Sequence, residues 1–226
     1  MRRYLQLGFL LVVVGIILWT ATAIYAALTK AGTSVTDWTA VAQNTIGESG
    51  TVSFTGNYAG SICIQAFLDT ETAHTGTEFI VQTSSHASSN EDWQDLTSFV
   101  GLIGTASTEA ITNDPLSAAS TTITVADTDA GTYELAGRWI AIEDGTLVNS
   151  ELIYLTGYTQ DTSITCLDGT TNEHAQSVAM FDIALSRTVQ LPVSTLRARV
   201  VVNNAYDIDG STLNYKVVET EVTAIQ

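Results

Sequence analysis

The segment that decides the fold class is TVSFTGN (residues 51–57) followed by SICIQAFL (residues 61–68). Apolar and polar residues alternate through residues 51–55, and Ile62, Ile64, Ala66 and Leu68 recur at every second position. Successive side chains of a strand point to opposite faces, so a period of two is typical of a half-buried β-strand. Gly56-Asn57 between the two runs is a turn signal. We predict two strands here, joined as a hairpin.

Similar runs extend this pattern on both sides of residues 51–68. Leu213, Tyr215 and Val217 alternate with polar residues after the turn signal Asp209-Gly210. The seven strands that we expect lie at residues 51–55, 61–68, 78–84, 96–103, 187–191, 196–202 and 213–222. Seven short strands are the number of an immunoglobulin-like β-sandwich, which we assign to residues 31–115 plus 185–226.

The interval between these strands has its own series of short apolar runs and turn signals. Five further strands are expected at residues 121–126, 138–143, 151–158, 163–167 and 178–183. Five strands of this length indicate a small β-barrel or sandwich module, inserted over residues 116–184. The alternative is a single larger β-sandwich that includes both sets of strands. The predicted fold class is therefore all-β.

A different kind of sequence precedes the strands. Residues 5–28 contain no charged side chain, and a helix of that length is about 36 Å long, enough to cross a hydrocarbon layer of about 30 Å. Arg2 and Arg3 precede the run, which favours a cytoplasmic amino terminus and an exported body. We expect residues 1–30 to form one hydrophobic α-helix, either transmembrane or in a filament core. Its anchor residues are Leu5, Leu10, Val13, Ile16, Leu18, Trp19, Ile24 and Leu28.

Two alternatives for this segment remain open. Ala21-Thr22-Ala23 resembles the cleavage site of a secretory signal, although the apolar run is longer than a signal core of about 7–15 residues. Gly8-Phe9 resembles the processing site of type IV prepilins, but Val13 stands where that family carries a glutamate. In a pilin-like subunit the helix would pack with its copies in the core of a filament.

The charge of the chain excludes one class of partner. The chain of 226 residues has a net charge of −16, and residues 31–226 carry 24 acidic against 5 basic side chains. Nucleic-acid affinity comes largely from cations that neutralise phosphates, so we expect no nucleic-acid binding. Cys63 and Cys166 are too few for a disulfide framework, and we interpret both as packed thiols.

Several short motifs resemble immunoglobulin-like β modules in structural proteins of tailed phages and in predicted surface proteins. In the sandwich these motifs are Ala73-His74-Thr75-Gly76-Thr77, Phe79-Ile80-Val81-Gln82, Glu91-Asp92-Trp93 and Asp207-Ile208-Asp209-Gly210-Ser211-Thr212. In the inserted segment they are Trp139-Ile140-Ala141-Ile142-Glu143-Asp144-Gly145, Asn149-Ser150-Glu151 and His174-Ala175-Gln176. The resemblance covers most of residues 50–215 and implies a repetitive, exposed scaffold on a particle or cell surface.

No motif of the sequence indicates catalysis. His74, His86 and His174 are not spaced as zinc ligands, and we expect them at the surface or in turns. The chain also has no G-x-S-x-G elbow and no phosphate-binding loop. We therefore predict a protein that is not an enzyme and has no cofactor, with calcium as the one possible ion.

Two features favour binding. Asp207 and Asp209 form the densest group of acidic turn residues, and calcium takes several oxygen ligands from such loops. Exposed aromatic rings can stack on sugars, and Trp93 is our candidate contact residue for a glycan because acidic residues flank it.

Together these patterns predict a non-enzymatic structural or assembly subunit on a cell or particle surface. Its partners would be membrane lipid or neighbouring hydrophobic helices, and other copies of the chain in a homo-oligomer. The expected location is membrane-anchored with an extracytoplasmic carboxyl-terminal domain, or the surface of a filament or virion. The alternatives are a pilin-like filament subunit and an adhesin or carbohydrate-binding module.

Overall fold

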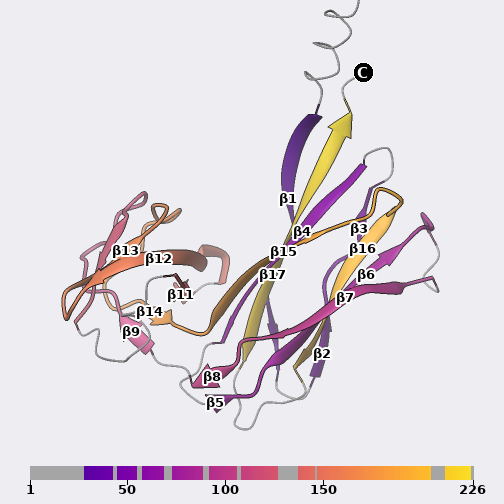
Figure 1. The fold of residues 1–226 in the computed structure, drawn as a ribbon. Coiled ribbons are helices and arrows are strands. Elements are labelled where there is room, and N and C mark those ends of the chain that lie inside the picture. The colour runs from indigo at the N-terminus through magenta and orange to yellow at the C-terminus, as the bar shows by residue number, and fades with distance from the viewer. Residues whose placement is uncertain are drawn as a thin grey trace, which may run out of the picture.

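A computed structural model of the chain describes residues 28–42, 45–54, 58–68, 73–88, 92–105, 108–126, 137–145, 147–204 and 212–224. These residues form an all-β protein with two separate bodies (Figure 1). The helix among them is a single 3-10 turn, η1 (Leu147–Asn149). Within the described ranges, no helix has both the length and the apolar character needed to cross a membrane.

The first sheet of the larger body has four strands in the order β1-β17-β4-β15. All neighbours are antiparallel, and β1 pairs with β17 from Leu28↔Ala224 to Val41↔Leu213. Both strands project beyond the rest of the body at one end (Figure 1). The bounds are β1 (Leu28–Val41), β4 (Tyr58–Leu68), β15 (Ala184–Gln190) and β17 (Leu213–Ala224).

The second sheet faces the first and has the order β2-β16-β6-β7, with β3 also paired to β16. A two-stranded ribbon of β5 and β8 lies at the end of the body near the second one (Figure 1). The bounds are β2 (Thr45–Glu48), β3 (Val52–Ser53), β5 (Ala73–His74), β6 (Thr77–Ser84), β7 (Gln94–Gly101), β8 (Gly104–Thr105) and β16 (Arg197–Asn204).

Apolar side chains from both sheets fill the space between them, so this body, which we call the sandwich, has one core. The predicted alternation is confirmed at β4, where every second residue is fully buried. At the start of β17 Leu213, Tyr215 and Val217 are fully buried as predicted, but Asn214 between them is buried as well. Burial of such side chains stabilises the fold by about 1.5–3 kcal/mol each. The core residues of these two strands are Ile62, Ile64, Ala66, Leu68, Leu213, Tyr215 and Val217.

Two expectations about the sandwich are wrong. Residues 51–55 and 61–68 do not form a hairpin, because β3 pairs with β16 in one sheet whereas β4 pairs with β15 and β17 in the other. Both runs alternate because each strand packs one of its two faces against the shared core, β3 from one sheet and β4 from the other. The sequence also did not predict β1, whose register with β17 shifts between Ser34 and Thr36 and again between Thr36 and Thr39. Each shift breaks the period of two.

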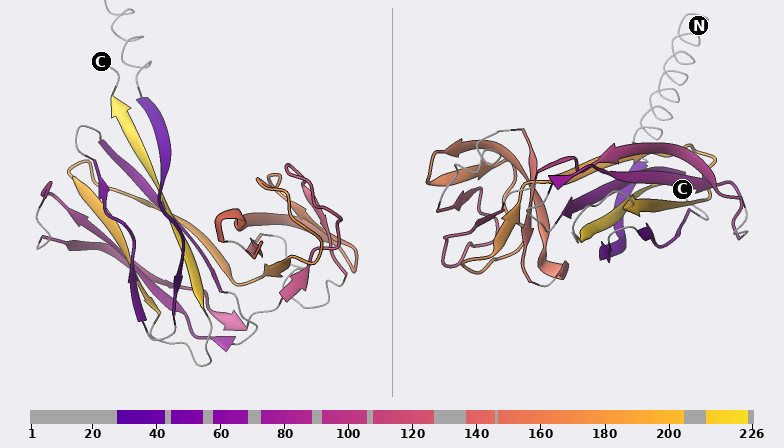
Figure 2. Two further views of the ribbon diagram at one scale, coloured as in Figure 1. Left: turned by 180° about the vertical axis from the view of Figure 1, so that it is seen from behind. Right: turned by 90° about the horizontal axis from the view of Figure 1, so that it is seen from below.

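The second body, which we call the second module, is a six-stranded antiparallel sheet in the order β10-β13-β12-β11-β14-β9. The sheet curls around its own apolar core (Figure 2), which includes Ile123, Ile140, Leu155 and Met180. Its first strand in the sequence is β9, which begins at Thr108 and pairs with β14. Its strands are β9 (Thr108–Ala110), β10 (Thr122–Thr124), β11 (Trp139–Glu143), β12 (Glu151–Thr159), β13 (Ser163–Cys166) and β14 (Ala179–Phe181).

The predicted hydrophobic helix falls almost entirely on residues 1–27, which lie outside the described residues. This holds for the anchor residues Leu5, Leu10, Val13, Ile16, Leu18, Trp19 and Ile24. Leu28, the last apolar residue of that run, is instead the first residue of β1 and pairs with Ala224. The helix therefore does not extend to residue 30, because the backbone groups of residues 28–30 belong to the β1–β17 ladder.

Candidate functional site

Buried aromatic rings join the two bodies. Trp38 of β1 meets the Phe67 ring edge to face at 5.1 Å, and Phe67 stacks on Phe181 of β14 at 6.2 Å. The Trp38 indole N–H donates a hydrogen bond of 2.7 Å to the backbone carbonyl of Ser150, which follows η1 in the second module. Ala141 completes this group of buried residues, which we call the junction. A shared apolar core of this kind fixes the second module against the sandwich.

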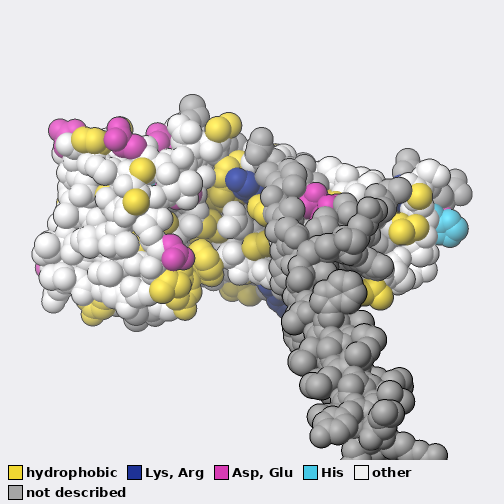
Figure 3. Space-filling model, turned by 90° about the horizontal axis from the view of Figure 1, so that it is seen from above, with side chains coloured by type: hydrophobic (Ala, Val, Ile, Leu, Met, Phe, Trp, Pro, Cys, Tyr) yellow, Lys and Arg dark blue, Asp and Glu magenta, His cyan; other side chains and the backbone are white. Residues whose placement is uncertain are grey.

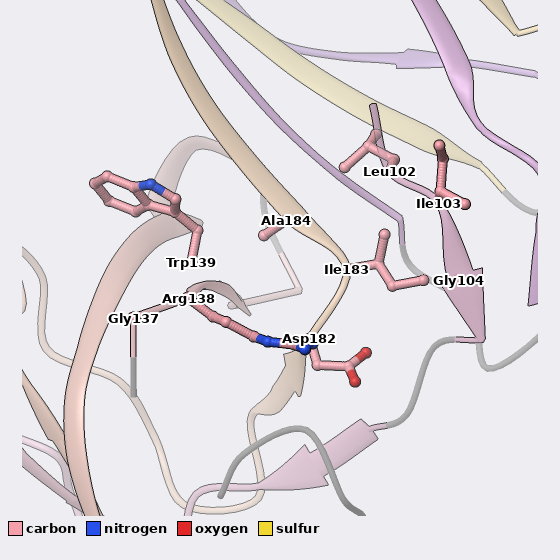
Figure 4. Close-up of a pocket in the computed structure, with 9 residues that line it drawn as sticks. All are labelled: Leu102, Ile103, Gly104, Gly137, Arg138, Trp139, Asp182, Ile183 and Ala184. Atoms are coloured by element: carbon pink, nitrogen blue, oxygen red, sulfur yellow. The ribbon is translucent and has the colours of Figure 1, made fainter. Parts of the chain in front are cut away.

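A pocket of about 550 Å³ opens beside the junction. The β7–β8 turn and the segment before β15 supply one wall from the sandwich side, and the start of β11 supplies the other. Figure 4 shows the Trp139 ring on one side and Ile103 on the other, with Arg138 extending across toward Asp182. The lining residues are Leu102, Ile103, Gly104, Gly137, Arg138, Trp139, Asp182, Ile183 and Ala184. We call this the junction pocket.

A group of three polar side chains lies inside the second module. The His174 ring has no exposed surface, and its Nδ1 lies 3.1 Å from an Asp144 carboxylate oxygen. Its Nε2 lies 2.6 Å from a Glu151 carboxylate oxygen. Glu151 also accepts hydrogen bonds from the backbone N–H groups of Thr171 and Asn172, at 2.7 and 3.2 Å. We call Asp144, Glu151 and His174 the histidine cluster.

The two carboxylates set the charge of this histidine. Burial by itself lowers the pKa of His174, but hydrogen bonds and charges from Glu151 and Asp144 outweigh it and raise the pKa above its ordinary value of 6.5. Burial by itself raises the pKa of Glu151, but the His174 hydrogen bond and two backbone N–H groups lower it below 4.5. Both pKa changes favour the charged His174–Glu151 pair over the neutral pair.

The chemistry of this cluster is structural. A general base needs a ring nitrogen that can take a proton from a nucleophile, and both nitrogens of His174 already face carboxylates. The nearby Cys166 thiol is buried, and burial together with the Glu151 charge raises its pKa to about 12. A thiol of that pKa is protonated at pH 7 and is a poor nucleophile. Cys166 and Cys63 are both free thiols in this structure.

We expected the three histidines at the surface or in turns, and two of them are not at the surface. His174 and His74 are buried, whereas His86 is exposed. The His74 ring lies 3.0 Å from the Thr77 hydroxyl, which in turn donates to the side chain of Asn204 on β16. The partners of His174 lie 30 and 23 residues away in sequence, so no local motif could have revealed them, whereas His74 contacts Thr77 only three residues along the chain.

Trp93 lies on the outer face of the second sheet, just before β7. Its ring is half-buried, with the guanidinium groups of Arg197 and Arg199 at 4.8 and 4.6 Å from the ring centre. Arg199 also contacts Glu48 at 3.0 Å. The ring therefore contacts two arginines of the same chain, and the role of Trp93 as a glycan contact stays a prediction.

The predicted calcium ligands Asp207 and Asp209 lie outside the described residues. Within the described ranges, no three histidine, cysteine or acidic side chains come together in a way that could hold a metal ion. Figure 3 shows acidic side chains gathered on the second module, on the left of the view. The calcium site stays a prediction.

Comparisons with known proteins find a weak structural resemblance to adhesin domains and viral capsid proteins. No family model and no curated protein matches the sequence. The cleaved K3 adhesin domain of Lys-gingipain from Porphyromonas gingivalis is 13% identical, with a TM-score of 0.29 over 79% of this chain. This chain covers 62% of that domain.

Two further structures cover more of their own length. The K1 adhesin domain of the same protein is 10% identical, with a TM-score of 0.32 over 88% of this chain and 99% of that one. The capsid of cyanophage Pam1 is 10% identical, with a TM-score of 0.26 over 87% of this chain and 86% of that one.

Proposed function

We propose that the protein is a non-enzymatic structural subunit on the surface of a cell or particle, built on an immunoglobulin-like sandwich. The apolar residues that precede β1 would hold it there, either in a membrane or against the same segment of other copies. The acidic body would face outward, and contacts between copies would use sheet edges and loops.

The β1–β17 ladder is the observation that carries this proposal. It starts at Leu28, the last residue of the apolar run, and continues without a linker to Val41 at the sandwich core. A load on the apolar segment would pass into a ladder of hydrogen bonds. The junction then links β1 to the second module through Trp38. This continuity suits a protein that transmits force and presents a rigid surface.

The described side chains also support a non-enzymatic role. The groups of the second module with a perturbed pKa are Glu151, His174 and Cys166; Glu151 and His174 are held by hydrogen bonds, and the Cys166 thiol is buried. Perturbed groups at a catalytic site are expected in a cleft that substrate can enter. Here they stabilise the module.

Cell fractionation of the full chain tests the anchor. The parent should remain in the membrane fraction after alkaline washing, with residue 1 or 2 as its first residue by mass spectrometry. The double variant Val13→Lys, Ile16→Lys should be released, because each lysine at the centre of a membrane helix costs about 2.5–3.5 kcal/mol. Val148→Lys, Val193→Lys is the matched control, since these valines are 77% and 80% exposed. Soluble, intact parent protein would overturn the proposal.

The filament alternative makes a different prediction for the same preparation. Electron microscopy of the detergent extract should show separate particles if the segment is a membrane anchor. Long polymers that dissolve in the double lysine variant would instead favour a pilin-like subunit. A product that lacks residues 1–23 would identify a cleaved signal.

A further inference from the structure

We propose that the outer face of the second sheet is a contact surface for a second copy of this chain. This outer face consists of the side chains of β2, β6, β7 and β16 that point away from the sandwich core. The second module packs against the first sheet through Trp38, and Figure 1 shows β6 and β16 on the other side of the sandwich. The inference rests on the proposed function, in which copies contact one another, and it names the surface that they use.

The strand register brings apolar side chains together on the outer face. Val201 of β16 pairs with Ile80 of β6 in the middle of the sheet. Ile46 of β2 and Val100 of β7 lie in the next row, at the two edges. Ile46 and Val100 are 67% and 59% exposed, and the other two residues are partly exposed. Neighbouring apolar side chains that stay exposed and have polar residues around them are typical of a protein–protein contact.

The polar side chains of the outer face bind one another along the sheet. The Arg199 guanidinium donates to the Gln82 side-chain carbonyl at 2.8 Å and to the Glu48 carboxylate at 3.0 Å. The Gln82 amide donates in turn to the Asp95 carboxylate at 2.7 Å. One chain of hydrogen bonds therefore crosses all four strands. A polar group that already has a hydrogen-bond partner costs less free energy to cover than one whose partner is water.

One end of the outer face carries a tryptophan with two arginines. The guanidinium groups of Arg197 and Arg199 lie 4.8 and 4.6 Å from the centre of the Trp93 ring. The ring is half-buried, so part of its surface stays accessible. Tryptophan and arginine are the residue types that contribute most often to the binding energy of protein–protein interfaces.

The charge of the outer face favours a second copy as its occupant. Residues 31–226 carry 24 acidic and 5 basic side chains, so two copies repel one another across most of their surfaces. Arg197 and Arg199 are two of those five, and three acidic residues share the face with them: Glu48, Glu78 and Asp95. Two positive and three negative charges leave a local net charge of −1. Two acidic chains can therefore approach one another here, whereas a basic partner would find stronger attraction elsewhere on the body.

The size of the outer face predicts a weak contact. Four strands about 4.8 Å apart and at most eight residues long, at about 3.3 Å per residue, have a plan area of about 500 Å². A specific interface buries about 600–1,000 Å² on each partner. Copies held together in one membrane or filament meet at a raised effective concentration, so a weak contact is sufficient there.

Sedimentation velocity of the full chain in detergent tests the proposal, at protein concentrations up to about 0.1 mM. The parent should form dimers. The double variant Ile46→Glu, Val100→Glu should weaken dimerisation by at least about 100-fold, because it places like charges of both copies in the contact. Val148→Glu, Leu167→Glu is the matched control and should dimerise like the parent, since these residues are 77% and 60% exposed on the second module.

The variant Val13→Lys, Ile16→Lys separates this inference from the proposed anchor. Dimers that are lost in Ile46→Glu, Val100→Glu and kept in the matched control support the outer face, whether or not the lysine variant dimerises. A monomeric parent, dimers that persist in Ile46→Glu, Val100→Glu, or an equal loss in the matched control would overturn the inference. Dimers lost only in the lysine variant would place the contact in the apolar segment instead. The proposed anchor fails on a different result, the release of intact parent from the membrane fraction.

Discussion

His174→Gln should destabilise the second module in a pH-dependent way. The variant removes a fully buried ring whose nitrogens lie 3.1 and 2.6 Å from two carboxylates. Breaking a buried ion pair by removing one partner costs about 3–5 kcal/mol. The Asp144 and Glu151 side chains retain 23% and 11% exposure, and Glu151 keeps two backbone N–H partners. We therefore expect His174→Gln to cost about 3 kcal/mol of stability, at the lower end of this range.

The pH dependence follows from the direction of each pKa change. The pKa of His174 is raised in the folded state, so its stabilisation is complete below pH 6.5 and is lost as the pH rises through the folded pKa. The pKa of Glu151 is lowered, so its stabilisation is present above pH 4.5 and is lost as the pH falls through the folded pKa. The parent module should be most stable between these two values. The cost of His174→Gln should be largest there and smaller at pH 9.

Hydrogen exchange of the full chain measures this effect within each body. At pH 5.5 the amides of β11, β12 and β14 should lose protection by a factor of about 100, equivalent to about 3 kcal/mol. The amides of β4 and β17 serve as the internal control and should change little. An equal loss of protection at pH 5.5 and pH 9 would refute the ion-pair argument. An equal loss in both bodies would refute its local character.

Three further substitutions test packing and charge. Trp38→Ala should lower the free energy of unfolding in urea by about 3–5 kcal/mol, and retention of parent stability would contradict a buried junction. Gly169→Ala should cost about 1–3 kcal/mol, because its Cβ would lie 2.5 Å from a backbone oxygen, whereas Gly157→Ala has 3.9 Å of room and should cost nothing. Glu219→Gln should raise the melting temperature at pH 7 but not at pH 4, because burial and a neighbouring glutamate raise the pKa of Glu219 and penalise its charge. The exposed Glu173→Gln should have no effect at either pH.

The strands that could be predicted are those with one buried face and an unbroken period of two. In β6, Phe79 and Val81 are fully buried while Ile80 and Gln82 are partly exposed, which is the division into two faces that a period of two predicts. Alternation specifies that a residue faces a core, but not which sheet it belongs to. The wrong hairpin between residues 51–55 and 61–68 follows from that limit.

The candidate site depends on contacts that no local pattern encodes. Trp38 reaches Ser150 across 112 positions of sequence, and His174 meets Asp144 and Glu151 across 30 and 23. Tertiary structure alone brings these partners together. From the sequence alone, Arg138 and Asp182 could be identified only as charged residues in or next to predicted strands. A turn signal beside a histidine or tryptophan therefore does not indicate whether that side chain is buried or exposed.

Thiol labelling of intact cells tests the central claim most directly. The full chain would be produced in a bacterial host with a single membrane, with Val193→Cys on the body or Tyr4→Cys on the amino-terminal tail. The parent is the blank, because Cys166 is buried and Cys63 is half-buried. A membrane-impermeant maleimide should label Val193→Cys in intact cells and Tyr4→Cys only after the membrane is opened. Labelling of Val193→Cys only after the membrane is opened would contradict a body displayed at the surface.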